Sequence, residues 1–179
     1  AKKEGLPITC DTAPPYFLLN DISLESYRTF LKLSPPLRNE EDRQEIIKGL
    51  IDGTIDSIVS DHTPHDQDGK RLPFNQAEFG GVGLETLLSC TLSLVKNNYL
   101  DIFKAISLVS YNPSKILGLN SGMIEEKMEA DISIFDPEKS WKVVPEKFFS
   151  KSKNSPFDGM LLEGKNIMTF VRGRLVYKL

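Results

Sequence analysis

The stretch that decides the fold runs from residue 55 to residue 65 and reads IDSIVSDHTPH. Its first five residues are mostly apolar, which predicts a short buried β-strand. Directly after them come Asp61, His62 and His65, and these two histidines are the only ones in the chain. A carboxylate can bind a metal ion or accept a proton, and histidine can act as a ligand, acid or base near neutral pH. A strand that ends in such residues is typical of an active-site edge.

Helix patterns precede and follow this strand. A helix is predicted over residues 39–53, because Asn39 is a favourable N-cap and the acidic residues after it complement the helix dipole. A second strand is predicted at residues 6–10, and longer helices at residues 84–96 and 101–110. Apolar strands that alternate with helices are typical of a parallel sheet buried on both faces. Folds of this kind keep their chemistry in the loops after the strands.

The last third of the chain has a different pattern. Short apolar runs predict strands at residues 132–135, 141–144, 168–171 and 175–177. Arg172 and Gly173 predict a tight turn between the last two strands. We therefore expect an α/β fold in which residues 1–120 form the last β/α units of a TIM-like (β/α)8 barrel and residues 121–179 form a β-rich segment. Two or three such units cannot close a barrel of eight strands, so a partial barrel is predicted.

The composition argues against several classes of protein. A chain of 179 residues with 40% hydrophobic residues can bury a core, and its formal net charge of −3, without a basic stripe, argues against a nucleic-acid partner. No apolar run approaches the roughly 20 residues that span a bilayer, so no membrane partner is expected. Cys10 and Cys90 are expected to be reduced thiols, which favours a cytoplasmic protein. The first residue is not Met, and the chain begins in the middle of a pattern, which indicates a fragment.

Four motifs, two of them made of two stretches each, occur in the same order as in the cyclic amidohydrolases, and they most resemble those of bacterial dihydroorotase. DSIVSDHTPH at residues 56–65 resembles the signature D-x-I-x-(T or S)-D-H-x-P-H. SPPLR at 34–38, followed by EDR at 41–43, resembles N-P-P-L-R-x-x-x-D-R. FGGVGLET at 79–86 resembles F-G-x-x-G-x-E-T. NPSKILGL at 112–119 and ADISIFD at 130–136 resemble the N-P-A-x-x-L-G-L and A-D-x-x-x-F-D segments with which that family ends.

The resemblance implies a metal-dependent, TIM-like barrel that carries a small β-sandwich built from both chain ends. The implied reaction is the reversible cyclisation of N-carbamoyl-L-aspartate to dihydroorotate in pyrimidine biosynthesis, with one or two zinc ions as cofactor. It implies that Asp61 both binds metal and carries the proton between water and the leaving nitrogen. The residues implied to contact the substrate are Ser34, His65, Phe79 and Gly80. His62 is expected either to orient a neighbouring group or to pack the loop.

Three departures from the family pattern qualify these expectations. Ser34 stands where the family has an asparagine that contacts substrate, so a two-pronged amide is replaced by one hydroxyl. Residues 13–16 read APPY where many relatives read T-P-H-H, which removes two imidazoles. The family's other metal ligands come from earlier strands, so this chain alone is expected to be inactive and to lack a complete zinc site. Lys70 and Arg71 are interpreted as exposed loop residues rather than as an anion clamp.

Several hypotheses therefore stand beside one another. The first is the C-terminal part of a dihydroorotase-like zinc enzyme, whose partners are the small-molecule substrate, the missing N-terminal half of the same protein and, in an oligomer, further copies. The second is a non-catalytic dihydroorotase homologue that binds aspartate carbamoyltransferase. The third keeps the enzyme but changes the ring, to a hydantoinase or allantoinase type of amidohydrolase.

Overall fold

The computed structural model describes residues 1–179. Its α-helices are α1 (Pro14–Leu18), α2 (Glu40–Asp52), α3 (Gln67–Arg71), α4 (Leu87–Lys96), α5 (Ile102–Val109) and α6 (Tyr111–Ile116). Its strands are β1 (Asp11–Thr12), β2 (Ser57–Ile58), β3 (Ile132–Lys142), β4 (Leu161–Val171) and β5 (Arg174–Lys178). Four short 3-10 helices complete the structure, namely η1 (Lys2–Glu4), η2 (Asp21–Leu24), η3 (Thr29–Leu31) and η4 (Pro145–Lys147).

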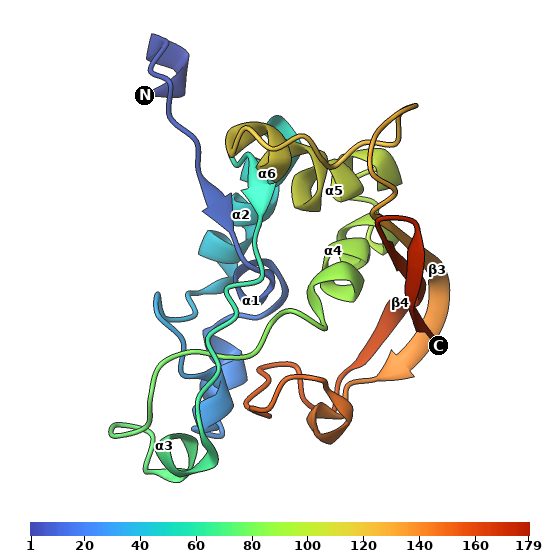
Figure 1. Ribbon diagram of the computed structural model, residues 1–179. Coiled ribbons are helices and arrows are strands. Elements are labelled where there is room, and N and C mark those ends of the chain that lie inside the picture. Colours follow the sequence, from blue (N-terminus) through green and yellow to red (C-terminus); the bar gives the residue numbers. More distant parts are fainter.

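The strands form two separate sheets (Figure 1). β1 and β2 pair in parallel, with Asp11 opposite Ser57 and Thr12 opposite Ile58, and β3, β4 and β5 form an antiparallel sheet in that order. The expected mixed α/β fold is therefore confirmed. The barrel, the sandwich and the division at residue 120 stay predictions, since two parallel strands and one three-stranded sheet are what the 179 residues contain.

Local sequence signals account well for the second helix and the last turn. The Asn39 side chain accepts a hydrogen bond from the Asp42 N–H at 2.9 Å, and α2 ends at Gly53 with a φ of 80°. Both Arg172 and Gly173 have positive φ, 50° and 74°, which is the conformation of a two-residue hairpin turn of type I′. These predictions are confirmed. Both features depend on hydrogen bonds within a few residues, so the local sequence suffices to predict them.

The strand predicted at residues 6–10 is wrong. Leu6 and Ile8 are 52% and 48% exposed, and the pairing with the neighbouring strand begins only at Cys10, whose carbonyl accepts a hydrogen bond from the Asp56 N–H at 2.9 Å. A strand requires a partner as well as apolar residues, and residues 6–9 have none. Only Asp11 with Ser57 and Thr12 with Ile58 are paired in register, so the predicted strand at 55–59 is also shortened to Ser57–Ile58.

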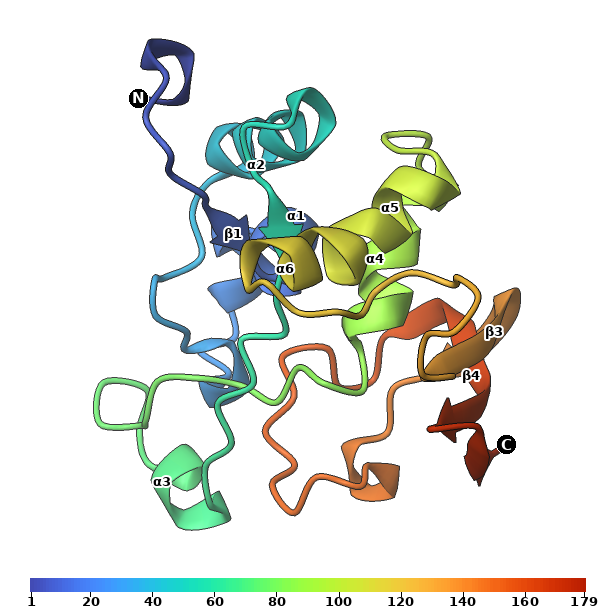
Figure 2. The same ribbon diagram turned by 45° about the horizontal axis from the view of Figure 1, so that its top comes forward.

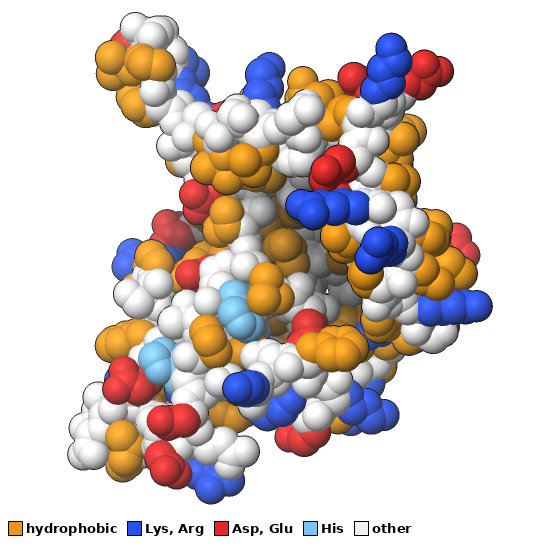
Figure 3. All heavy atoms as spheres, in the orientation of Figure 1, with side chains coloured by type: hydrophobic (Ala, Val, Ile, Leu, Met, Phe, Trp, Pro, Cys, Tyr) orange, Lys and Arg blue, Asp and Glu red, His pale blue; other side chains and the backbone are white.

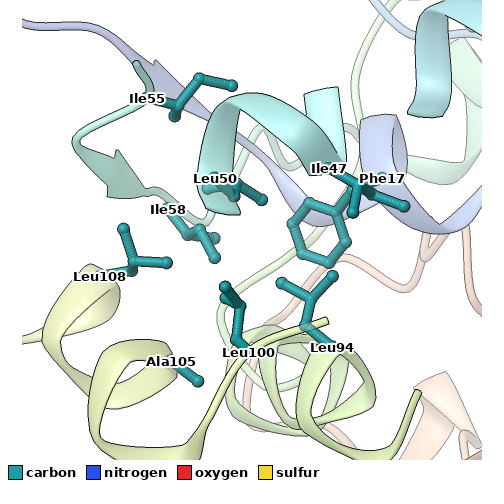
Figure 4. Packing of buried hydrophobic residues seen from close by; sticks show 9 residues of the cluster. All are labelled: Phe17, Ile47, Leu50, Ile55, Ile58, Leu94, Leu100, Ala105 and Leu108. Atoms are coloured by element: carbon teal, nitrogen blue, oxygen red, sulfur yellow. The ribbon is translucent and has the colours of Figure 1, made fainter. Parts of the chain in front are cut away.

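The larger apolar cluster packs the helices around the parallel strands (Figure 4). Its side chains point toward one another from α1, α2, β2, α4 and α5, with flanking residues before β2 and α5. The members are Phe17, Ile47, Leu50, Ile55, Ile58, Leu94, Leu100, Ala105 and Leu108. This cluster holds the end of β2, and therefore the start of the loop that carries Asp61, in place.

A second cluster joins the antiparallel sheet to α4, which lies between the sheet and the rest of the helices in both ribbon views (Figures 1 and 2). Its members are Val82, Cys90, Val143, Phe148, Phe157 and Leu162. The Trp141 indole N–H donates to the Ser89 hydroxyl at 3.0 Å and to the Gly164 carbonyl at 3.1 Å. This second cluster therefore contains residues from both sides of position 120. None of the helices has the length and apolar character that crossing a membrane requires.

Candidate active site

Asp61 follows β2 by three residues, at the edge where the two parallel strands end. Its φ of 45° lies in the left-handed region, which aspartate tolerates better than most residues. The side chain is exposed, and its carboxylate forms no hydrogen bond or ion pair within the protein. It lines a pocket of about 690 Å³ together with Asp11, Tyr16, Ser34 and Arg38. A carboxylate in this position is free to meet a ligand.

Tyr16 presents a protonated phenol to this pocket. Burial raises the pKa of Tyr16 to about 12, and the nearby negative charge of Asp61 adds to the shift. Its hydroxyl donates to the Pro35 carbonyl at 3.0 Å. In the sequence Tyr16 is notable only because it replaces a histidine of the family motif. In the structure it lines the pocket and donates a hydrogen bond.

Ser34 lines the same pocket as Asp61. Leu33 and Leu37, on either side of it, are only 3% and 5% exposed, so they anchor the loop in the interior. The Ser34 hydroxyl has no hydrogen-bond partner within the protein and is exposed. It can therefore donate to or accept from a ligand, with one group instead of the two that an amide provides.

His65, Phe79 and Gly80 come together in a second group, formed by two adjacent loops. The His65 ring Nε2 lies 2.7 Å from the Phe79 carbonyl oxygen. Because a carbonyl can only accept, Nε2 carries the proton and Nδ1 is left for a ligand. The Gly80 N–H donates to the Lys32 carbonyl at 2.9 Å, whereas the Phe79 N–H has no partner in the protein. Figure 3 shows the histidines at the surface, with side chains of both charges around them.

His62 connects its own loop to the glycine-rich loop rather than facing Asp61. Its Nδ1 accepts a hydrogen bond from the Gly83 N–H at 3.2 Å, which leaves the proton on Nε2. The next residue, Thr63, donates its N–H to the Gly81 carbonyl at 2.8 Å. These contacts hold the segment after Asp61 against residues 80–83.

The interpretation of Lys70 as an exposed residue is wrong. Lys70 is only 2% exposed, because α3 folds it under the loop that leads to Phe79. Its ammonium group donates to the Glu78 carbonyl at 2.7 Å, and Lys32, also buried, donates to the Asn75 carbonyl at 3.1 Å. The Lys32 ammonium also lies 4.4 Å from the centre of the Phe79 ring. The residues around Lys70 in the sequence are mostly polar, and nothing in their pattern indicates that this side chain is buried.

The burial of Lys70 predicts a pH-dependent stability. Burial, followed by the charge of Lys32, lowers the pKa of Lys70 to about 8 from its ordinary value of 10.5. Between these pH values the unfolded chain binds more protons than the folded one, so the Lys70 contribution to stability rises with pH. From pH 7.5 to 10.5, wild type should gain about 2–3 kcal/mol relative to Lys70→Met. Urea unfolding of both proteins across this range measures the difference, and a constant difference would contradict the prediction.

The residues of this chain do not form a metal site by themselves. No group of three or more His, Cys, Asp or Glu side chains comes together. A catalytic zinc ion takes about three protein ligands. Asp61 offers one free carboxylate, while His62 Nδ1 and His65 Nε2 are both engaged with backbone groups.

Sequence comparisons place the chain among known proteins. Residues 22–176 match the family model described as "Amidohydrolase family". A protein named dihydroorotase from Citrifermentans bemidjiense is 47% identical over 178 residues, and one from Anaplasma phagocytophilum is 45% identical over 178 residues. These matches cover 99% of this chain but 42% and 40% of the two proteins. The chain thus spans less than half the length of these relatives.

Solved structures with a similar fold carry a different name. The L-hydantoinase (dihydropyrimidinase) of Arthrobacter aurescens matches with a TM-score of 0.93 at 30% identity, over 99% of this chain and 41% of that one. The D-hydantoinase (dihydropyrimidinase) of a Thermus species matches with a TM-score of 0.90 at 25% identity, again over 41% of its length. The chain therefore has the fold of proteins named hydantoinase, whereas its sequence is more similar to that of proteins named dihydroorotase.

Proposed function

The chain belongs to the amidohydrolase family, and we propose that the full-length protein is a dihydroorotase that interconverts N-carbamoyl-L-aspartate and dihydroorotate. The observation that carries this proposal is the 44–47% identity, over nearly all of the chain, to proteins named dihydroorotase. The hydantoinase structures share the fold at 30% identity or less. A shared fold does not identify the substrate, so the higher sequence identity is the better guide to it.

Asp61 is the residue that we propose as proton carrier. Hydrolysis of the ring requires that a proton leave the attacking water and reach the ring nitrogen as the amide bond breaks. A carboxylate that lines the pocket and has no partner in the protein can accept the first proton and deliver it to the nitrogen. The reverse reaction returns the same proton and releases water.

The substrate groups of dihydroorotate match the free groups around the site. Dihydroorotate has a carboxylate, two ring carbonyls and two ring N–H groups. We propose that His65 Nδ1, the Phe79 N–H and the Ser34 hydroxyl bind these groups, with the Phe79–Gly80 backbone lining the ring. Each of the three has no hydrogen-bond partner within the protein, which supports this assignment.

Zinc, one or two ions, belongs to the proposal for the full-length protein only. Asp61 would be one ligand, and the other ligands would lie in the part of a dihydroorotase that this chain does not span. Association with further copies or with aspartate carbamoyltransferase is likewise proposed for the full-length protein.

A hydantoinase-type activity is the second candidate, and the TM-score of 0.93 to an L-hydantoinase favours it. A substrate panel separates the candidates. We expect the full-length protein to turn over dihydroorotate with a kcat/KM at least about 100-fold above that for hydantoin, dihydrouracil or allantoin. Chelation should remove the activity and added zinc should restore it. A preference for hydantoin would replace the proposal with the second candidate, and no turnover of any ring with zinc present would favour the non-catalytic homologue.

A further inference from the structure

Asn154 is a buried polar residue that none of the sequence motifs includes. It lies in the loop between η4 and β4, and only 2% of its surface is exposed. The neighbouring Ser155 and Phe157 are fully buried, and Phe157 belongs to the cluster that joins the antiparallel sheet to α4. A side-chain amide this deep in a protein is costly unless it forms hydrogen bonds. Its partners are therefore informative.

The Asn154 side chain bonds to both loops that carry the proposed substrate contacts. Its Oδ1 accepts from the His65 N–H at 3.4 Å. Its Nδ2 donates to the Thr63 carbonyl at 3.3 Å and to the Gly80 carbonyl at 3.3 Å. Bonds of this length are individually weak, but together they place the amide between the two loops and satisfy its polar atoms. One amide thus spans the gap between the histidine loop and the Phe79–Gly80 loop.

The surrounding contacts make this bridge rigid. The Asn154 backbone carbonyl accepts from the Val82 N–H at 3.1 Å. A Cβ at Gly80 would lie 2.6 Å from the Thr63 methyl carbon, and one at Gly81 would lie 2.9 Å from Pro156 Cδ. The two loops are therefore closely packed against each other and against the segment that contains Asn154. The same loops are also joined directly, by the contact between His65 Nε2 and the Phe79 carbonyl at 2.7 Å and by the hydrogen bond from the Thr63 N–H to the Gly81 carbonyl at 2.8 Å.

We propose that Asn154 is a positioning residue that sets His65 Nδ1 and the Phe79 N–H at the distance a cyclic substrate requires. This inference rests on the proposed function. Asn154 reaches the substrate only through His65 and the Phe79–Gly80 backbone. It lies outside the pocket that Asp61 lines, so it acts on substrate binding and leaves the proton transfer to Asp61.

The test is the Asn154→Asp variant of the full-length zinc-loaded protein, which keeps the acceptor toward His65 but loses both donors. We expect KM for dihydroorotate to rise roughly tenfold or more, with kcat changed less than about threefold. In a His65→Ala background the same substitution should raise KM little further, because the residue through which Asn154 acts is gone. Asn112→Asp is the matched control, since Asn112 also donates to a backbone carbonyl, that of Asp56, at 2.8 Å. It should leave KM unchanged.

A second measurement does not depend on turnover. The ring nitrogens of His65, assigned by the signal that disappears in His65→Gln, should shift in the NMR spectrum of Asn154→Asp and stay in place in Asn112→Asp. Should Asn154→Asp not fold, Asn154→Ser is measured in the same way. An unchanged KM and unchanged ring signals, in a protein that hydrolyses dihydroorotate, would overturn the inference alone. If the full-length protein hydrolyses no dihydroorotate, the proposed function is wrong, and the signals of the His65 ring nitrogens still test the role of Asn154.

Discussion

Replacing Asp61 with asparagine is expected to lower kcat for dihydroorotate by about a thousandfold in the full-length protein. Asparagine has the same shape but cannot accept the proton that must pass from water to the ring nitrogen. The loss should appear in both directions of the reaction, measured by the change in dihydroorotate absorbance with zinc present. The fold should be intact, because the Asp61 carboxylate has no partner within the protein that the substitution would remove.

The backbone of Asp61 also favours this substitution as a clean test. Its φ of 45° is a conformation that asparagine adopts at least as readily as aspartate, so no strain is added. Asp21→Asn is the matched control, since Asp21 is likewise exposed and lies outside the pocket. It should retain wild-type activity. An Asp61→Asn enzyme within tenfold of wild type would exclude Asp61 as the proton carrier.

Gly83→Ala is expected to cost about 3 kcal/mol of folding stability. A Cβ at this position would lie 2.0 Å from the Ser60 carbonyl oxygen, far inside any permitted contact. Both partners of this clash belong to the backbone or to its first carbon, so no side-chain rotation can relieve it. Ser60 directly precedes Asp61, and the Gly83 N–H donates to His62, so the substitution should also displace the loop that carries Asp61. Urea unfolding followed by circular dichroism measures the loss.

Gly49→Ala provides the comparison for this prediction. An added Cβ at Gly49 would meet only side-chain atoms, Cδ1 and Cγ1 of Ile55 at 3.0 and 3.1 Å, so a shift of a few tenths of an ångström relieves the contact. Gly49 lies within α2, where alanine is favoured over glycine by roughly 1 kcal/mol, so stability should change little. Equal stabilities for Gly83→Ala and Gly49→Ala would mean that the close approach of the two loops does not constrain the fold.

The residues of the candidate site could be proposed from the sequence because they lie in short motifs. The segment at 56–65 identified Asp61 and His65, and the segments at 34–38 and 79–86 identified Ser34 with Phe79 and Gly80. The structure puts Asp61 and Ser34 on one pocket, joins His65 to the Phe79 carbonyl, and connects it to Gly80 through the Asn154 side chain. Their roles stay predictions until the variants are measured.

The parts that could not be predicted all depend on distant contacts. Lys70 is an ordinary polar loop residue in the sequence, and it is buried only because α3 folds beneath the loop leading to Phe79. Residues 6–10 have a strand-like pattern but find no neighbour to pair with before Cys10. Tyr16 acquires its raised pKa from the walls of a pocket that several segments build.

The sequence by itself determined the elements that depend on near neighbours, such as the cap of α2 at Asn39 and the turn at Arg172 and Gly173. It also contains the motif that carries Asp61 and His65. Capping hydrogen bonds and turn conformations depend on residues a few positions apart, so the pattern of types suffices. Only the tertiary structure decided which loops meet. The bond from His65 to Asn154 joins residues 89 positions apart, and it forms because the apolar cluster around Phe157 brings the two loops together.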